Sequence, residues 1–295
     1  MAIFVEKSIQ LLTISPKDIA VAKLHNYLLS AIAPRPIALA STIDELGNPN
    51  LSPFSFFNVF SANPPILIFS PARRVRDNTT KHTLENALAI KEVVINVVTH
   101  SIVHQTSLSS TEYKKGVNEF DKAGFTMVAS ELVKPFRVKE SPVQFECKVL
   151  EIKELGKEGG AGNLIICEVL RIHVDEKVLD ENQNIDQIKL DLVARAGGSL
   201  YSRARESFFE IPKPIKSKGI GVDKIPESVQ KSNILTGNDL GMLANIESLP
   251  DQGDVDKFMQ DNPGFVTQKL NEKHKFAQEF LKKNDVISAW KVLLS

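Results

Sequence analysis

The stretch "NLSPFSFFNVFSANPP", residues 50–65, sets small polar side chains among aromatic rings. The polar positions recur every third residue, at Ser52, Ser55, Asn58 and Ser61. Pro53 and the weak helix preference of these residue types argue against a helix, and the period of three argues against a simple half-buried strand. The stretch predicts either a polar platform for a flat ligand or a buried bend whose polar groups bond the local backbone.

The runs on either side of this stretch are rich in β-branched and apolar residues. Strands are predicted at residues 36–43, 64–70 and 92–98, and a hairpin is predicted from two long runs, 143–156 and 163–179, joined by the glycine-rich "KEGGAG". Helices are predicted at residues 79–90, with Thr79 or Thr80 as the N-cap, and at residues 100–110. Many strands with few helices favour a barrel or a sandwich.

The pattern changes near residue 211. The segment "IPKPIKSKGIGVDKIP", residues 211–226, reads as a linker or an extended arm, and helical patterns without a convincing strand follow it. We therefore predict a β-rich domain over residues 1–212 and a linker with a helical extension over residues 213–295. Within the extension, residues 274–290 are predicted to form an amphipathic helix on the body or on a partner subunit, with Trp290 in a core.

Charge and composition exclude several classes of protein. The net charge of +0 argues against a general nucleic-acid binder and gives no polybasic signal for a membrane surface. No apolar run is long enough to span a bilayer, and "MAIFVEKSIQLL" lacks the order of regions expected of a signal peptide. Cys147 and Cys167 are predicted to be buried free thiols rather than a disulfide, and we expect a cytoplasmic protein.

Cations and hydroxyls gather in "SPARRVRDNTTKHT", residues 70–83, at the predicted start of a helix. A helix N-terminus offers unpaired N–H groups and a positive dipole end, so this segment fits a phosphate site as well as an ordinary solvated loop. Together with the polar and aromatic stretch before it, the segment fits flavin mononucleotide (FMN), whose ring needs a flat pocket and whose tail needs cations.

Several motifs then occur in one order: residues 34–71, "KHTLENA", "VVINVV", "GVNEFDKAGFT" and "ARAGGSLYSR". Over roughly residues 20–212 this order resembles the flavin-reductase-like, FMN-binding split-barrel family, and its flavoredoxin-like branch most of all. The resemblance implies a mainly β, Greek-key split barrel with a C-terminal helical extension. It also implies a homodimer with FMN near the interface, and enzymes that reduce flavin with NADH or NADPH.

The resemblance also carries site residues onto this sequence. It implies that Ser41 and Thr42 approach the flavin ring, as do Ser52, Ser55, Asn58 and, as a weaker match, Ser61. Most of the phenylalanines among them would then face the core.

Further residues of the resemblance lie at the phosphate end and over the cofactor. Lys81 and Thr83 match the phosphate end, with Arg73 or Arg74 as a helper, and Arg195, Gly198 and Tyr201 match a segment that closes over the cofactor. In one place the sequence departs from its relatives, which often have histidine where Gly162 and Asn163 stand here. Asn163 keeps a hydrogen-bonding side chain at that place.

Three functions follow from these residues. The first is an FMN-dependent oxidoreductase that accepts hydride from NADH or NADPH, with the flavin supplying the chemistry and no catalytic acid or base assigned. The second is an FMN-binding electron carrier or flavin store, and the third is a non-catalytic interaction protein. A metal site at His100 and His104 is not predicted, because no HExxH pattern or carboxylate set completes it.

Overall fold

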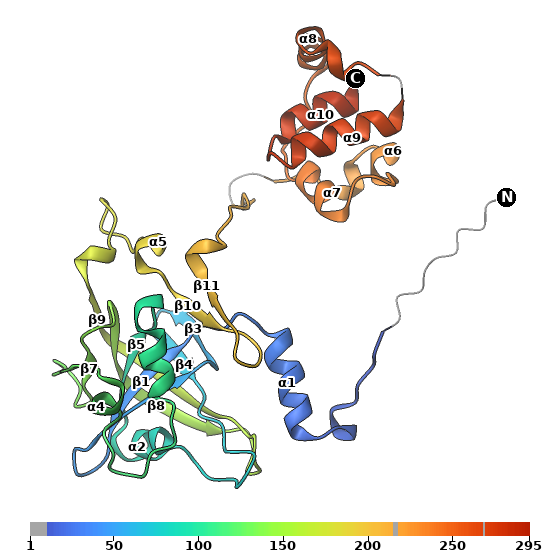
Figure 1. Ribbon diagram of the computed structural model, residues 1–295. Helices are drawn as coiled ribbons and strands as arrows, with labels where there is room; N and C mark the ends of the chain where they lie inside the picture. The colour runs from blue at the N-terminus through green and yellow to red at the C-terminus, as the bar shows by residue number, and fades with distance from the viewer. Residues whose placement is uncertain (1–10, 215–217, 268) are drawn as a thin grey trace. The chain divides into compact units, whose positions relative to one another are not determined.

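The computed structural model describes residues 11–214, 218–267 and 269–295, which form two compact units, Met1–Phe208 and Phe209–Ser295. Each unit is described by itself (Figure 1). The sequence placed the boundary after residue 212. The prediction that the first residues do not resemble a signal peptide falls mainly on residues 1–10, which lie outside the described residues. Residues 215–217 of the predicted linker lie outside them as well.

A seven-stranded antiparallel sheet forms the first unit. Its strands, in sheet order, are β2 (Pro49–Phe54), β1 (Ala38–Ile43), β5 (Glu92–Val97), β8 (Val143–Glu154), β9 (Asn163–Val174), β4 (Pro65–Phe69) and β3 (Phe57–Ala62). The unit also contains the helices α1 (Val21–Ala31), α2 (His82–Ile90), α3 (Val103–Leu108), α4 (Glu119–Ala123) and α5 (Gln187–Leu190). Two short strand pairs are β6 (Met127–Val128) with β7 (Arg137–Val138) and β10 (Val193–Arg195) with β11 (Tyr201–Arg203).

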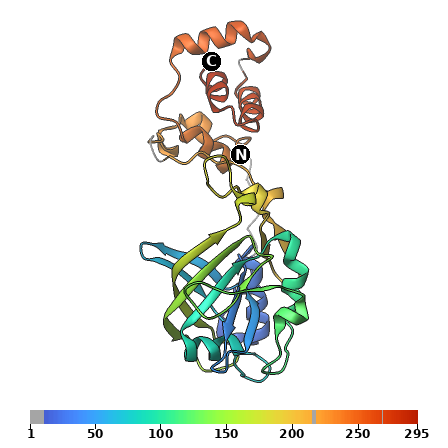
Figure 2. The ribbon, with the colours of Figure 1, turned by 90° about the vertical axis from the view of Figure 1, so that its left-hand side faces the viewer.

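Residues 50–65 fold as strand, bend and strand, and this bend determines the shape of the sheet. Strands β2 and β3 lie at opposite edges of the sheet, yet only Ser55 and Phe56 separate them in the chain. Six strand spacings would hold the edges roughly 29 Å apart in a flat sheet. The link from Phe54 to Phe57 reaches at most about 11 Å. The sheet must therefore roll up, and Figure 2 shows its strands wrapping into a barrel.

Strand β1 is buried on both faces, which explains its nearly continuous apolar sequence. Ala38 and Ala40 face a core cluster that most strands of the sheet and α2 share, the barrel interior. Leu39 faces a second cluster, in which Phe120 of α4 and Ile102 cover the outside. The predicted barrel is confirmed, and both cysteines are buried and free, as predicted.

The phenylalanines of the bend are arranged differently from the prediction. Phe54 is buried and Phe57 packs against the interior cluster, but Phe56 and Phe60 are 38% and 63% exposed. The prediction that most of these rings face the core is wrong. The physical reason is that β3 is an edge strand paired only with β4, and the consecutive residues Val59 and Phe60, which point to opposite faces of it, are both largely exposed.

The predicted helix over residues 79–90 begins three residues later, at His82, with Lys81 as its N-cap residue. Neither predicted cap threonine caps it. The Thr79 hydroxyl instead donates to Asp77 (2.6 Å), and the Thr80 hydroxyl donates to Glu85 (2.7 Å). The Thr79 hydroxyl bonds within the loop before the helix, and the Thr80 hydroxyl bonds a side chain of the first helical turn, so the first helical N–H groups have no side-chain cap. The helix predicted at residues 100–110 is confirmed as a short 3₁₀ turn followed by α3.

The second unit is helical, as predicted, and no strand occurs in its described residues. Its helices are α6 (Glu227–Gln230), α7 (Gly237–Ala244), α8 (Gln252–Asp261), α9 (Leu270–Leu281) and α10 (Val286–Leu294). Trp290 is fully buried, and its indole N–H donates to the Leu243 carbonyl (2.9 Å). Residues 274–290 span parts of α9 and α10 rather than one helix. Ala277, Leu281 and Trp290 among them are buried in this unit's own core, and packing on the body or on a partner subunit stays a prediction. Among the described residues, no helix combines the length and the apolarity that crossing a membrane requires.

Acid should destabilise the helical unit through His274. This side chain is 1% exposed, its Nδ1 lies 2.8 Å from the Ser232 hydroxyl, and its Nε2 has no partner among the described residues. Burial lowers the pKa of His274 below its ordinary value of 6.5. The folded state thus favours the neutral ring. The stability that this neutral ring contributes to the folded state is fully present above pH 6.5 and is lost as the pH falls through the folded-state pKa.

The unfolding temperature should fall between pH 7.5 and pH 5 when it is followed by the fluorescence of Trp290, the single tryptophan in the sequence. The His274→Gln variant should show a smaller dependence on pH over the same range. Equal pH dependence in the two proteins would contradict this role for His274.

Candidate functional site

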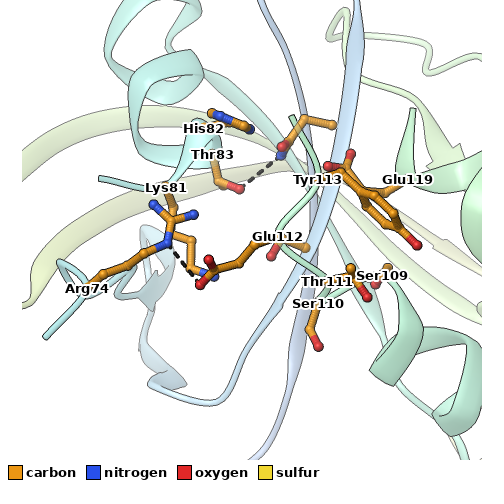
Figure 3. Close-up of a pocket in the computed structure, with 12 residues that line it drawn as sticks. Arg74, Lys81, His82, Thr83, Ser109, Ser110, Thr111, Glu112, Tyr113 and Glu119 are labelled. Carbon is orange, nitrogen blue, oxygen red and sulfur yellow. Dashed lines mark hydrogen bonds and ion pairs between the residues drawn. The ribbon is translucent and has the colours of Figure 1, made fainter. Parts of the chain in front are cut away.

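A pocket lies between the start of α2 and the chain segment after α3 (Figure 3). Asn50 and Ser52 of β2 and Glu119 of α4 line it from the barrel. Its other lining residues are Arg74, Lys81, His82, Thr83, Ser109, Ser110, Thr111, Glu112 and Tyr113. Of the predicted site residues, the structure thus brings Ser52, Lys81 and Thr83 together.

The start of α2 offers free donors to this pocket. The first backbone bonds of the helix run from the Leu84 and Glu85 N–H groups to the Lys81 carbonyl. In the described part of the chain, the N–H groups of His82 and Thr83 have no acceptor, and no side chain caps the helix. An uncapped N-terminus of this kind, with its positive dipole end, attracts an anion.

Lys81 and Thr83 add a cation and a hydroxyl to these N–H groups. The Lys81 ammonium forms no ion pair or hydrogen bond with the residues that the structure describes, and burial, together with the nearby charge of Arg74, lowers its pKa. The buried Thr83 hydroxyl accepts from the Asn50 amide (2.9 Å), which leaves its own hydrogen to donate. An anion would therefore meet one free cation and one oriented hydroxyl.

Arg74, rather than Arg73, is the arginine of the pocket. Its Nη1 donates to the Thr79 hydroxyl (2.8 Å) and to the Thr80 carbonyl (2.6 Å), and its Nε pairs with Glu112 (3.1 Å). Arg73 is turned to Asn78, to which it donates twice (2.7 and 2.8 Å). Arg73 closes the loop, and the structure gives it no place in the pocket lining.

The β8–β9 hairpin loop supports this arginine loop. The Arg73 N–H donates to the Ala161 carbonyl (2.8 Å), and the Gly160 N–H donates to the Arg73 carbonyl (2.9 Å). At Gly159, a Cβ would stand 3.0 Å from the Arg74 carbonyl oxygen. The sequence predicted only a hairpin connection here. The structure shows that the glycine also permits a close backbone approach.

Asn163 supports the same loop from the start of β9. Its backbone N–H donates to the Ser70 hydroxyl (3.0 Å), and its side-chain amide donates to the Pro71 carbonyl (2.8 Å). Its Oδ1 is buried and has no partner in the described chain. The contacts give Asn163 a supporting role for residues 70–71, and its direct contact with a cofactor stays a prediction.

Ser41 and Thr42 lie inside the sheet, both 0% exposed. The Thr42 hydroxyl accepts from the amides of Asn50 (3.1 Å) and Asn86 (3.1 Å), so Thr42 reaches the pocket through Asn50. The Ser41 hydroxyl has no partner within the described residues. Their contacts with a flavin ring stay predictions, because neither side chain is exposed to solvent in this structure.

The remaining polar residues of the opening stretch lie away from the pocket lining. Asn58 and Ser61 are on the edge strand β3, where Asn58 Oδ1 accepts from the Val59 N–H (2.8 Å) and the Ser61 hydroxyl accepts from the Asn63 N–H (3.2 Å). Ser55 lies in the bend between β2 and β3. Their roles toward a cofactor stay predictions.

Arg195 and Tyr201 lie in a second, open pocket, which His100, His104 and Arg203 also line. The Arg195 guanidinium donates to the Tyr201 hydroxyl (2.6 Å) and to the Gly198 carbonyl (2.7 Å) and stacks on the Tyr201 ring. This pocket shares no residue with the first one. The structure therefore separates these three predicted residues from Lys81 and Thr83.

Eight of the residues that line the first pocket were not identified from the sequence, among them Asn50, Glu119 and Glu112. Asn50 pairs with Thr42 across β1 and β2, and the turn residues between these strands, Asp44, Gly47 and Asn48, were the available signal for that pairing. Glu119 is 5% exposed and accepts the Leu51 N–H (3.0 Å); burial raises its pKa. Glu112 lies at the rim, and no local pattern marked it. Among the described residues, no group of three or more His, Cys, Asp or Glu side chains is placed to hold a metal ion.

Comparison with known proteins identifies the class. Residues 30–192 match the family described as the flavin reductase like domain, which is more than half of the 295 residues. The chain therefore belongs to this family. It is 39% identical over 181 residues to an uncharacterised protein of Aquifex aeolicus, covering 61% of this chain and 90% of that protein. It is 31% identical over 187 residues to the uncharacterised YwrF of Bacillus subtilis, with 62% and 90% covered.

Solved structures agree with this family. Nitrilotriacetate monooxygenase component B from Bacillus cereus is 28% identical, with a TM-score of 0.64 over 69% of this chain and 100% of that one. A split-barrel protein of Shewanella frigidimarina, provisionally named a flavin reductase, is 26% identical, with a TM-score of 0.57 over 67% and 95%. The predicted family and split-barrel fold are thus confirmed, and the helical unit, Phe209–Ser295, lies beyond the family match.

The contact at Gly159 can be tested by stability. Gly159→Ala should lower the free energy of unfolding of the β-rich unit by about 1–3 kcal/mol, because its methyl group would press on the backbone of Arg74 and Val75. Denaturant unfolding followed by far-UV circular dichroism measures this loss. Gly241→Ala, in helix α7 of the other unit, adds a Cβ that meets no atom within 4 Å and should leave the unfolding of the β-rich unit unchanged. A Gly159→Ala protein as stable as the parent would show that the loops do not depend on this contact.

Proposed function

We propose that this protein binds FMN and acts as an NADH- or NADPH-dependent oxidoreductase of the flavin reductase type. The observation that carries the proposal is the uncapped start of α2, where Lys81 and Thr83 offer a free cation and a free hydroxyl hydrogen. Membership of the flavin reductase like family supports a flavin as the ligand of this corner.

The residues present fit the phosphate end of FMN. A phosphate monoester carries up to two negative charges and three acceptor oxygens. The N–H groups of His82 and Thr83, the Thr83 hydroxyl and the Lys81 ammonium are the donors that such a group requires. We place the phosphate there and the ring toward Ser52, which lines the same pocket from β2.

Bound flavin supplies a ring that takes up a hydride from a nicotinamide and passes electrons on. The chain's own part is to hold the phosphate, to orient the ring by Ser52 and the β2–β3 bend, and to exclude water. No side chain is assigned as a catalytic acid or base. An electron carrier or flavin store would use the same pocket, so the test below must distinguish this second function from the first. We further propose a location in the cytoplasm, which the buried free thiols support.

We also propose that the chain forms a homodimer. The edge strand β3 supports this, because its Val59 and Phe60 are 64% and 63% exposed, and exposed apolar edges are usually covered. Sedimentation equilibrium would measure the mass directly, and a monomer at micromolar concentration would contradict the proposal.

The function is tested by a visible absorption spectrum of the purified protein after incubation with FMN and desalting. Flavin bands should remain, and NADH or NADPH added without oxygen should bleach them. Bands that persist after both nicotinamides would favour the carrier or store. A colourless protein would refute flavin binding and leave a non-catalytic scaffold.

The phosphate site is tested by removing its charge and hydroxyl. Lys81→Ala combined with Thr83→Ala should weaken FMN binding by more than about tenfold, through loss of charge-assisted hydrogen bonds. Riboflavin, which has no phosphate, should bind both proteins alike. Fluorescence titration gives both affinities, circular dichroism checks the fold, and Lys153→Ala on β8 serves as the control. An unchanged FMN affinity would show that the phosphate is placed wrongly.

A further inference from the structure

The second pocket lies in the β-rich unit and has two walls. One wall is a single face of the 3₁₀ turn and α3, whose side chains recur three or four residues apart: His100, Val103, His104 and Ser107. The other wall is the β10–β11 hairpin, which contributes Val193, Arg195, Tyr201 and Arg203. The pocket is open, and its volume of about 490 Å³ lies within the range of small-molecule sites, roughly 300–1,000 Å³.

Contacts of the chain itself hold the hairpin wall in place. The buried Arg35 donates to a carbonyl of α1 (2.6 Å) and to a carbonyl of the hairpin (3.1 Å). At Gly197, a Cβ would stand 2.5 Å from the Ser30 hydroxyl oxygen, so the hairpin and α1 approach closely (Figure 1). The two walls are joined where the His100 N–H donates to the Asp191 carbonyl (2.9 Å). Walls fixed in this way lower the entropy that ligand binding must remove.

Arg195 is a positive charge without a carboxylate partner in this pocket. Its Nη1 donates to the Tyr201 hydroxyl (2.6 Å), its Nη2 donates to the Gly198 carbonyl (2.7 Å), and its guanidinium stacks 4.7 Å from the centre of the Tyr201 ring. These partners are uncharged, and no carboxylate in the described part of the chain forms an ion pair with Arg195. Two of its five N–H donors are used, which leaves three for a ligand.

A second arginine stands directly opposite Arg195. The backbones of Arg35 and Arg195 form an antiparallel bridge and exchange two hydrogen bonds of 2.8 Å. Side chains that face each other in this way start from the same face, where like charges are destabilising. Burial and the charge of Arg195 lower the pKa of Arg35, whose guanidinium donates only to carbonyls among the described residues. An anion beside Arg195 would offset this repulsion.

The carboxylates near the hairpin are already paired. Arg203 donates to Asp191 (2.7 Å) and to Glu206 (2.8 Å), and Arg205 lies 3.3 Å from Asp191. Three guanidinium groups on the hairpin and the turn after it, with Arg195 as the third, therefore face two carboxylates. Positive charge exceeds negative charge by one in this group, even without Arg35 and the two histidines.

We propose that this pocket is a second ligand site, which binds a small organic anion by its carboxylate or phosphate group between the Arg195 guanidinium and the Tyr201 hydroxyl. The hydroxyl accepts from Arg195 and so keeps its own hydrogen for the anion. A guanidinium with free N–H groups matches two oxygens of a carboxylate or a phosphate. Val103 and Val193 offer apolar surface to the organic part of the ligand.

This second site goes beyond the proposed function and does not rest on it, because the two pockets share no lining residue. The pockets are neighbours all the same. Ser107 lines the second pocket and Ser109, two residues later, lines the first.

The test measures dissociation constants of benzoate, benzamide and adenosine monophosphate (AMP) for the full-length protein by isothermal titration calorimetry. Benzamide has the shape of benzoate without its charge, so benzoate should bind at least about tenfold more tightly if the anion is a carboxylate. Tighter binding of AMP than of benzoate would assign the site to a phosphate instead.

Two variants locate the anion that binds. Arg195→Gln should weaken its binding by at least about tenfold, through loss of charge-assisted hydrogen bonds. Tyr201→Phe keeps the ring beside the guanidinium and removes only the hydroxyl, so it should weaken binding by a smaller factor. Arg171→Gln, on β9 and outside the pocket lining, is the matched control and should change nothing. Circular dichroism checks the fold of each variant.

The outcomes separate this inference from the proposed function. A parent that binds neither benzoate nor AMP would overturn the inference, as would an anion affinity that is unchanged in folded Arg195→Gln. If Arg195→Gln does not fold, an unchanged affinity in folded Tyr201→Phe would overturn it. The FMN affinity of Arg195→Gln should equal that of the parent; an equal loss of FMN and of the anion would make the pocket part of the flavin site. A parent that binds the anion but no FMN would refute the proposed function alone.

Discussion

The two-residue link between β2 and β3 is the constraint on which the rest of this structure depends. Because Ser55 and Phe56 join strands at opposite edges of one sheet, the sheet closes on itself and creates an interior. Closure buries Ala38 and Ala40 on the inner face of β1, while Phe120 of α4 and Ile102 cover Leu39 on its outer face. Strand β3 stays an edge strand, on which Val59 and Phe60 are exposed. The same bend is therefore tied to both the barrel interior and the exposed edge.

The pocket is tied to the barrel by a short chain of amide and hydroxyl contacts. Asn86 and Asn50 both donate to Thr42, deep in β1, and Asn50 also donates to Thr83 at the start of α2. The arginine loop is tied separately, through Asn163 and the hairpin loop at residues 157–162. Residues far apart in sequence thus fix the walls of the pocket before any ligand binds. Such prior ordering lowers the entropy that binding must remove.

Sequence patterns predicted the strands, the hairpin, the buried thiols and the helical second unit, because these follow from local periodicity and composition. They predicted Lys81 and Thr83 because a cation and a hydroxyl at a helix start are a local signal. The exposure of Phe60 depends on the place of β3 at the edge of the sheet, which no local pattern shows. The sequence left the choice between Arg73 and Arg74 open, and only the folded loop shows that Arg73 donates to Asn78 while Arg74 lines the pocket. Glu112 became visible only when folding brought residues 109–113 beside the arginine loop.

The start of α2 is less stable than it could be, because it lacks a side-chain cap and partly buries an unpaired lysine. A capped helix would be more stable by about 1 kcal/mol, and a partly buried lysine without a partner is disfavoured by desolvation. Thr79 and Thr80 are close enough in sequence to serve as caps, yet their hydroxyls donate to the carboxylates of Asp77 and Glu85 instead. The lowered pKa of Lys81 reflects the same unfavourable burial beside Arg74. A bound phosphate would relieve both costs at once, since it caps the free N–H groups and pairs with the ammonium. The free energy of this corner would therefore be lower with an anion bound than without one, and that difference would favour anion binding at the start of α2.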